Sequence, residues 1–216
     1  DNLTNAIELS LSTNGSVADT DSDGIIDGFE ERYGTDPLNP DTDKDGLADG
    51  VEIIAKLSPT SDKTNGKPDA DVRVSNRINF DEGYLDISGS VNVYSANVEK
   101  LSLYSVEANV GAYSAPYEFY CKSEFDEANI TFSYSPGLLT AAGLEADDLH
   151  IYKFNPRSKE FTDIGGTHDT ENNTVSCKIN ENGVYLIGAD HIIHTVIDEK
   201  TFEIVLSDGT VLKYEE

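Results

Sequence analysis

The sequence predicts a mainly β protein in which an acidic, loop-rich segment with short helical turns precedes an antiparallel β-sandwich and a C-terminal β-hairpin. Two observations predict this class. Acidic segments of the same pattern occupy residues 19–30 and 41–52. From about residue 78, short runs rich in Val, Ile, Tyr, Phe and Thr recur between turn residues. The expected parts are a repeat pair (1–57), a linker (58–77), a β-sandwich (78–190) and a C-terminal extension (191–216).

The two acidic segments repeat one ligand pattern. Carboxylates stand at positions 1, 3, 5, 9 and 12, namely Asp19, Asp21, Asp23, Asp27 and Glu30, and then Asp41, Asp43, Asp45, Asp49 and Glu52. Glycine at position 6 permits a sharp turn, and the carbonyl at position 7, from Ile25 or Leu47, adds a ligand. A hard cation that takes six to eight oxygens needs such spacing, because alternate residues of a curled loop point inward. The pattern therefore predicts at least two Ca²⁺ ions, whereas the smaller octahedral cage of Mg²⁺ fits less well.

The connector between the loops carries further oxygen ligands. Asp36 and Asn39 either lend a ligand to a neighbouring site, where a third ion could be shared, or serve turn chemistry around Pro37 and Pro40. Short helical turns are expected over residues 28–33 and 50–57, the first ending at Gly34. An acidic stretch can also be a solvated loop that binds no ion. Because the full pattern of five carboxylates and a glycine occurs twice, the sequence favours calcium loops.

A third, decayed copy of the pattern follows the second loop. Aligning Asn65-Gly66 with Asp23-Gly24 places Lys63 at position 3 and Asp69 at position 9. A lysine among the ligands argues against an ion. The segment is therefore expected to be a turn-rich linker, in which Asp62 or Asp69 remain candidates to help a nearby site.

Residues 17–55 resemble the thrombospondin type 3 calcium repeats of bacterial surface and secreted proteins. The resemblance rests on the Asp-Thr-Asp-x-Asp-Gly-x-x-Asp-Gly-x-Glu motif, on the connector from Tyr33 to Pro40 and on the second Asp-Thr-Asp. It implies short segments wrapped around calcium ions, which act as spacers beside adhesive or catalytic domains. It also implies an extracellular or cell-surface location.

Composition favours the same setting. The net charge is −26 and the sequence pI is about 4.2, so long-range repulsion disfavours binding to nucleic acid or to an anionic membrane surface. No run approaches the ~20 apolar residues that span a bilayer, so membrane insertion of this chain is not expected. The chain has no methionine, which indicates a processed product or a piece of a larger protein.

The β region is expected to form short antiparallel strands. Their predicted ranges are residues 84–87, 91–94, 101–106, 117–123, 129–133, 149–154, 161–163, 174–179, 183–189, 195–197, 201–206 and 210–214. Ser207-Asp208-Gly209 is a strong hairpin turn between the last two. Only residues 136–147 are expected to be helical, for a turn or two.

Residues 107–189 resemble β-sandwich modules of bacterial surface proteins that are similar to ZU5 and GAIN-type domains. The resemblance is carried by residues 125–134, 149–154 and 169–176. Self-cleaving relatives carry a His-x-Ser/Thr site near the last strands, but Asn182-Gly183-Val184-Tyr185 stands here. The resemblance therefore implies a structural or adhesive unit without autoproteolysis.

Cysteine, histidine and tyrosine residues leave alternatives open. Strand parity points both Cys121 and Cys177 toward the core, so either a disulfide or two buried thiols is expected. His191 and His194 are expected in extended chain, which disfavours a zinc site, and His168 in a hairpin turn. Alternating tyrosines are either a sugar-binding platform or sheet surface and core, the candidates being Tyr94, Tyr104, Tyr113 and Tyr117.

These observations predict a non-catalytic, calcium-stabilised structural or adhesive region of a large secreted or cell-surface bacterial protein. Besides calcium, its expected partner is a surface protein or a polysaccharide. Two alternatives stay open: a dockerin-like protein-docking module, which also uses two calcium loops, and an accessory calcium-binding region of a secreted enzyme or toxin component.

Overall fold

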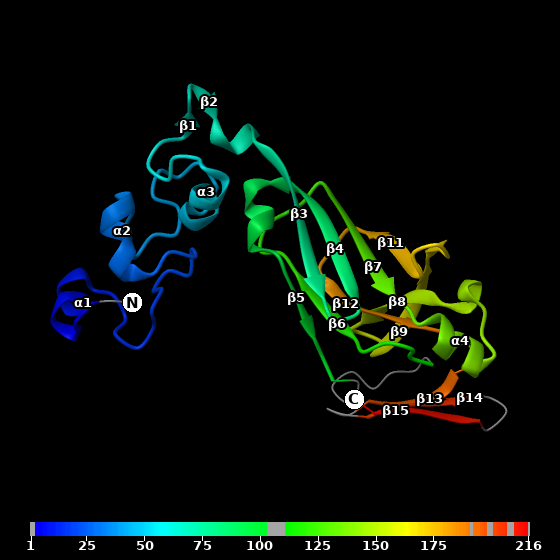
Figure 1. The fold of residues 1–216 in the computed structure, drawn as a ribbon. Coiled ribbons are helices and arrows are strands. Elements are labelled where there is room, and N and C mark those ends of the chain that lie inside the picture. The colour runs from blue at the N-terminus through cyan, green and yellow to red at the C-terminus, as the bar shows by residue number, and fades with distance from the viewer. Residues whose placement is uncertain (1–2, 103–110, 191, 198–200, 207–209, 216) are drawn as a thin grey trace. The chain divides into compact units, whose positions relative to one another are not determined.

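A computed structural model describes residues 3–102, 111–190, 192–197, 201–206 and 210–215. The protein is mainly β, as the sequence predicts, and short helices occupy its N-terminal part (Figure 1). The chain divides into two compact units. Unit 1 comprises Asp1–Asn76, Ser88–Ser95 and Lys122–Asp126, and unit 2 comprises Arg77–Ile87, Ala96–Cys121 and Glu127–Glu216. Unit 1 thus takes in two short segments that the sequence assigned to the sandwich.

Three seven-residue helices in unit 1 share one form: α1 (Asn5–Leu11), α2 (Asp27–Tyr33) and α3 (Asp49–Ala55). Each is followed by a residue in the left-handed conformation, which is Ser12, Gly34 or Lys56. The N–H of that residue donates to the carbonyl of Glu8, Glu30 or Glu52, respectively. The helical turns expected after both acidic loops are therefore present, and α1 is a further copy.

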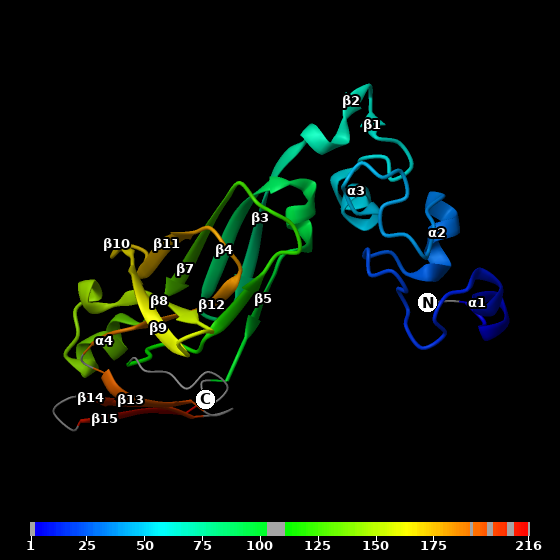
Figure 2. The same ribbon diagram turned by 180° about the vertical axis from the view of Figure 1, so that it is seen from behind.

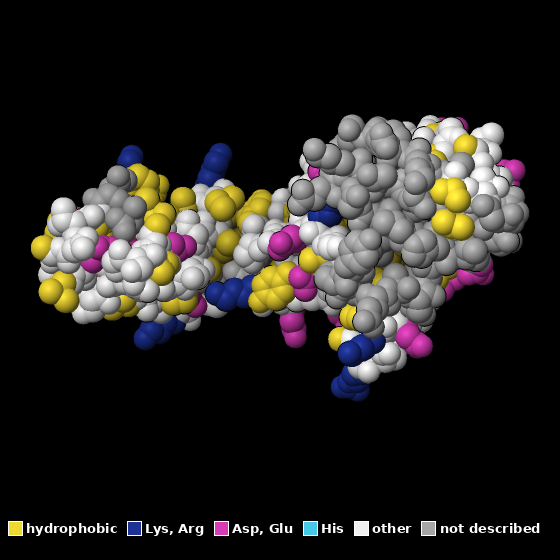
Figure 3. Space-filling model, turned by 90° about the horizontal axis from the view of Figure 1, so that it is seen from below, with side chains coloured by type: hydrophobic (Ala, Val, Ile, Leu, Met, Phe, Trp, Pro, Cys, Tyr) yellow, Lys and Arg dark blue, Asp and Glu magenta, His cyan; other side chains and the backbone are white. Residues whose placement is uncertain are grey.

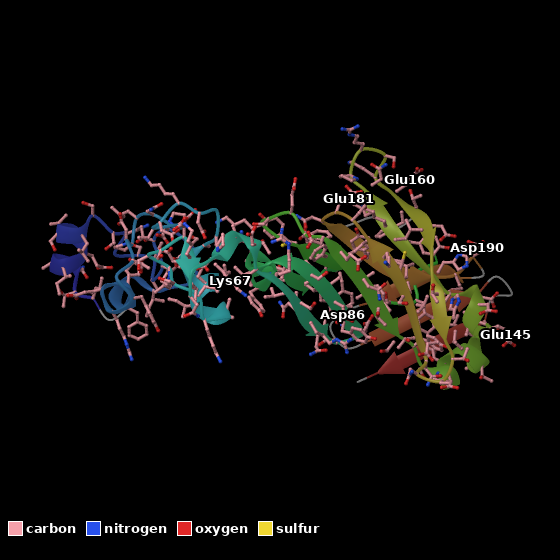
Figure 4. The ribbon with its side chains drawn as sticks, turned by 90° about the horizontal axis from the view of Figure 1, so that it is seen from above. Lys67, Asp86, Glu145, Glu160, Glu181 and Asp190 are labelled. Atoms are coloured by element: carbon pink, nitrogen blue, oxygen red, sulfur yellow. The ribbon has the colours of Figure 1, made fainter. Side chains whose placement is uncertain are left out.

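The segment predicted as a linker has more structure than expected. It contains a two-stranded hairpin of β1 (Lys63–Thr64) and β2 (Lys67–Pro68), followed by the 3₁₀ helix η1 (Asp69–Asp71). Lys67, labelled in Figure 4, lies on β2. The strand β3 (Arg73–Phe80) begins before residue 78, and its side chains alternate between exposed and half-buried. The sequence missed β3 because its outward face is polar and its inward face is only partly buried.

A small apolar core holds the second acidic loop in unit 1. Leu47 and Val51 pack with Val91, and Val72 and Val74 cover them. Val91 opens the 3₁₀ helix η2 (Val91–Ser95). A strand was predicted over residues 91–94, and this was wrong, since Val91 and Val93 are both buried in a tight turn whose spacing imitates strand alternation.

Two five-stranded sheets form the sandwich, which lies largely in unit 2. The first has the order β10-β11-β7-β4-β3, and its further strands are β4 (Gly83–Ser90), β7 (Glu127–Ser133), β10 (Thr167–Asp169) and β11 (Thr174–Ile179). The second has the order β5-β6-β12-β8-β9, with β5 (Asn97–Lys100), β6 (Tyr117–Tyr120), β8 (His150–Asn155), β9 (Glu160–Gly165) and β12 (Gly183–Gly188). β7 and β11 pair antiparallel, as do β12 and β8.

The two sheets pack face to face (Figure 1, Figure 2), and the side chains buried between them are mainly apolar. Ring centroids of Phe80 on β3 and Tyr117 on β6 lie 4.5 Å apart, and Phe132 on β7 lies 5.9 Å from Tyr117. Because β6 belongs to one sheet and β3 and β7 to the other, these contacts join the layers into the predicted sandwich. The predicted helical turn is also present, as α4 (Pro136–Ala142) followed by the 3₁₀ helix η4 (Ala146–Asp148).

The C-terminal part is a three-stranded antiparallel sheet of β13 (Ile192–Ile197), β14 (Thr201–Leu206) and β15 (Val211–Glu215). β14 pairs with both neighbours, so the predicted hairpin strands are present, and the strand predicted over residues 195–197 is part of β13 beside them. The turn Ser207-Asp208-Gly209 and most of the strand predicted over residues 101–106 lie outside the described residues.

In the face that Figure 3 shows, acidic side chains are interspersed with basic and apolar ones. Within the described ranges, none of the helices is both long and apolar enough to cross a membrane.

Candidate metal centres

The first acidic loop gathers its aspartates at one point. Asp19, Asp21 and Asp23 each offer a carboxylate oxygen within 4.8 Å of the others. The N–H groups of Ser22 and Gly24 donate to the two oxygens of Asp19, at 2.8 and 3.0 Å. Gly24 has φ +101°, a conformation that side chains rarely adopt. The glycine at position 6 therefore allows the turn that brings the carboxylates together.

The second loop repeats this geometry in Asp41, Asp43 and Asp45, whose oxygens also lie within 4.8 Å of one another. Gly46 has φ +94°, and its N–H donates to Asp41 Oδ2 at 2.9 Å. Two independent stretches of chain thus build the same three-carboxylate cluster.

The position-12 glutamates are buried beside these clusters. Glu30 is 1% exposed and Glu52 is 0% exposed. All four of their carboxylate oxygens lack a hydrogen-bond partner among the described residues, as does one oxygen each of Asp21, Asp23, Asp43 and Asp45. A buried charge without a partner costs several kcal/mol or more. The residues therefore fit a bound cation that supplies the missing partner.

Burial raises the pKa values of several of these carboxyl groups. Burial raises the pKa of Glu30 to about 8, with the charges of Asp21 and Asp23 adding to the effect. Burial likewise raises the pKa of Glu52 to about 9, helped by Asp45 and Asp43. In the first loop, burial raises the pKa of Asp23 to about 7, although the N–H of Ile25 opposes the shift. Protons therefore compete with any cation for these sites.

The position-9 aspartates are placed differently from the other predicted ligands. Both oxygens of Asp27 accept hydrogen bonds from Thr20, at 2.8 Å. Both oxygens of Asp49 accept from Thr42 in the same way, at 2.9 and 2.7 Å. Asp49 also lies within 4.8 Å of Asp23 and Glu30, ligand atom to ligand atom, and all three residues are buried. Asp49 therefore faces the cluster of the first loop.

Asp36 and Asn39 adopt turn roles. Asp36 Oδ1 accepts from the N–H of Leu38 at 3.2 Å, and Asn39 Nδ2 donates to the carbonyl of Asp41 at 2.8 Å. These contacts favour the turn alternative over a shared third ion. A ligand role for Asp36 remains a prediction.

The side chains and the backbone groups of Ile25 and Leu47 have separate roles. Their side chains are buried, and their N–H groups donate to Asp23 Oδ1 at 2.6 Å and Asp45 Oδ1 at 2.8 Å. The coordinating role of their carbonyls stays a prediction.

Two further acidic residues are buried like the ligands: Glu8, which the sequence did not place in a site, and Asp69, which it named as a candidate to help a nearby site. Glu8 lies 22 positions before Glu30 and is buried, and its Oε1 has no partner among the described residues. Asp69 is 1% exposed. The 22-residue spacing of Glu8, Glu30 and Glu52 was the available signal for the first. The sequence left open which site Asp69 would help, because its loop is shortened.

The other candidate residues are placed as structural side chains. Cys121 is buried and Cys177 is half-buried, and no disulfide joins them. Tyr113 and Tyr117 lie in the core, which rules out a platform that includes them, while Tyr104 lies outside the described residues. His168 is on β10 and not in a turn, with Nε2 2.7 Å from the carbonyl of Leu149.

Comparisons with known proteins address the repeats alone. Residues 19–40 and 41–56 match the family model described as the bacterial TSP3 repeat. This confirms the resemblance drawn from the two loops, and these repeats are calcium-binding. Neither a curated protein nor a solved structure matches the chain. The likeness of the β region to ZU5 and GAIN-type modules stays a prediction.

Proposed function

We propose that this chain is a non-catalytic, calcium-stabilised structural region of a secreted or cell-surface protein, in which the ion-loaded repeats stiffen the approach to the β-sandwich. One observation carries the proposal: Glu30 and Glu52 are buried beside three-aspartate clusters with no hydrogen-bond partner in the described residues. The match to bacterial TSP3 repeats supports calcium as the cation. A surface protein or a polysaccharide is the proposed partner of the β-sandwich.

The ion would act by removing repulsion within the repeats. Residues 19–52 carry many carboxylates and only Arg32 and Lys44 as basic residues. With dissociation constants of ~10⁻⁴ to 10⁻³ M, as in extracellular modules, each site contributes about 0.4 to 1.4 kcal/mol at millimolar calcium. Sites of that affinity would fill only where calcium is abundant.

Calorimetric titration of chelator-stripped protein tests the proposal. We expect at least two calcium sites. Glu30→Gln and Glu52→Gln should each weaken one site, because a bidentate carboxylate is lost while the backbone ligand stays. Glu31→Gln is the matched control, since this neighbouring glutamate is exposed and its substitution changes the charge by the same amount. Fewer than two sites in the parent chain would refute the proposal.

A docking function is favoured by a different observation. Phe29 and Tyr33 on α2 are exposed, whereas Val51 and Ala55, at the same positions of α3, pack against Val91. The uncovered face of α2 could therefore receive a partner protein. Nanomolar binding of a cohesin-type partner that Phe29→Ser abolishes, while calcium affinity stays unchanged, would establish docking.

A further inference from the structure

The segment of residues 58–72 retains the fold of a repeat although it has lost most of its acidic ligands. Three N–H groups, each 22 positions apart, donate to a threonine hydroxyl: Asn14 to Thr20, Asp36 to Thr42 and Ser58 to Thr64, at 2.9, 3.0 and 2.9 Å. The third segment therefore begins in register with the two acidic loops.

The same threonines hold an aspartate in all three segments. The N–H and Oγ1 of Thr64 donate to Asp69 Oδ1 and Oδ2 at 2.7 and 2.8 Å. Thr20 holds Asp27 and Thr42 holds Asp49 by equivalent pairs of bonds. The third pair is separated by five positions instead of seven, so two loop residues are missing while the aspartate is kept in the same place.

The position-9 aspartate of one repeat serves the preceding loop. Asp49 brings a carboxylate oxygen within 4.8 Å of Asp23 and Glu30. The backbone around it is equally close, since a Cβ on Gly50 would lie 2.3 Å from the carbonyl oxygen of Asp23. The first loop is thus closed by a residue from the second repeat.

Asp69 holds the corresponding position in the third segment and is buried, with 1% of its surface exposed. This segment lies against the second loop, because Val72 packs against the core that contains Leu47 and Val51. Glu52, fully buried with two unpartnered oxygens among the described residues, gives an independent indication that a cation is required here.

We propose that Asp69 completes the calcium cage of the second loop, and that residues 58–72 are a terminal half-repeat retained to supply it. A carboxylate has about four lone-pair positions, so the two hydrogen bonds from Thr64 leave capacity for an ion. The third segment has no calcium cage of its own, because Lys63 stands at a ligand position and two loop residues are missing. This loss does not affect the role of Asp69 in the second loop. The inference rests on the proposed calcium-binding function.

Loop-resolved titration of the full 216-residue chain tests the assignment. The amides of Gly24 and Gly46 report the two loops separately by NMR, because each donates to the first aspartate of its own loop. In Asp69→Asn we expect the calcium midpoint at Gly46 to rise at least about tenfold while that at Gly24 stays unchanged. Asp71→Asn, an equal change of charge at an exposed residue of the same 3₁₀ helix, should leave both midpoints unchanged.

Two further variants separate a ligand from a structural residue. Thr64→Val removes the hydroxyl bond to Asp69 but keeps its charge, so its effect at Gly46 should be smaller than that of Asp69→Asn. Equal effects would show that Asp69 acts through the fold and would overturn the assignment, as would an unchanged Gly46 midpoint in Asp69→Asn. Asp49→Asn should shift Gly24 more than Gly46. If neither glycine responds to calcium in the parent chain, the proposed function fails instead.

Discussion

The repeats and the sandwich bury different chemical groups. The fully buried side chains of the sandwich are mainly apolar, as with Ile130, Phe132 and Leu186. In the repeats, the most deeply buried side chains include Asp49 and Glu52, which are fully enclosed carboxylates. An apolar core is stable by itself, because its burial is favourable in water. A core of carboxylates is stable only with counter-charges, so the two regions should respond differently to the removal of metal.

Removing calcium should produce the largest difference between the regions. We expect chelation to make residues 17–57 mobile and sensitive to protease, while the sandwich from about residue 78 to 214 stays folded. Limited proteolysis with mass spectrometry, with and without chelator, measures both regions at once. Digestion of the sandwich at the rate of the repeats would show that calcium is integral to both.

A substitution that creates a cavity in the core of the sandwich should have the next largest effect on stability. Phe132 is fully buried and contacts Phe80 and Tyr117, so Phe132→Ala should lower the free energy of unfolding by about 3–5 kcal/mol. Tyr120→Ala, at an exposed aromatic residue on β6, is the control and should cost within about 0.5 kcal/mol. Denaturant unfolding should show the same loss with chelator as with calcium. A loss that depends on calcium would couple the core to the metal sites.

A smaller effect should follow from crowding the contact between the repeats. Gly50→Ala places a Cβ 2.3 Å from the carbonyl oxygen of Asp23, and overpacking of this kind costs roughly 1–3 kcal/mol. Gly137→Ala on α4 is the matched control, since its Cβ would meet only Ser135 Oγ, at 3.9 Å. We expect Gly50→Ala to raise the calcium midpoint at Gly24 and Gly137→Ala to leave it unchanged. Equal midpoints in both variants would mean that the second repeat does not support the first loop.

Sequence reasoning reached the ligands that lie within one loop. The three aspartates of each loop meet because a glycine with positive φ turns the chain locally, so their spacing alone specifies the cluster. The position of Asp49 against Glu30 depends instead on how one repeat follows the next. Contacts between successive repeats cannot be predicted from the spacing of residues within a single loop. Asp69 could be named from the sequence only as a candidate for an unspecified nearby site, because two missing residues broke the register that relates it to Asp49.

Strand prediction succeeded where runs of β-branched and aromatic residues are bounded by turn residues. The predicted ranges 174–179 and 201–206 coincide with β11 and β14. The prediction failed at Val91 and Val93, where a 3₁₀ turn buries two valines that are two positions apart. Period-two burial is therefore not unique to strands when a segment is only five residues long.

The smallest expected effect is an exchange of protons for calcium. In the metal-free protein the pKa values of Glu30 and Glu52 are raised to about 8 and about 9, chiefly by burial. The stability that their protonation provides is present below their ordinary pKa of about 4.5 and is lost as pH rises through 8 to 9. At pH 7 calcium must therefore displace protons, on the order of one per site. The sandwich, whose core is apolar, should show no such coupling.

Calorimetric titrations at pH 7 in two buffers of different ionisation enthalpy count these protons. We expect release at pH 7 and less release at pH 9, where the glutamates are closer to ionised. Glu52→Gln should remove the contribution of the second loop and leave that of the first, since glutamine carries no displaceable proton. Binding at pH 7 without proton release would mean that the buried glutamates are already ionised. The difference between the apolar core of the sandwich and the metal-dependent repeats would then rest only on repulsion between carboxylates in the repeats.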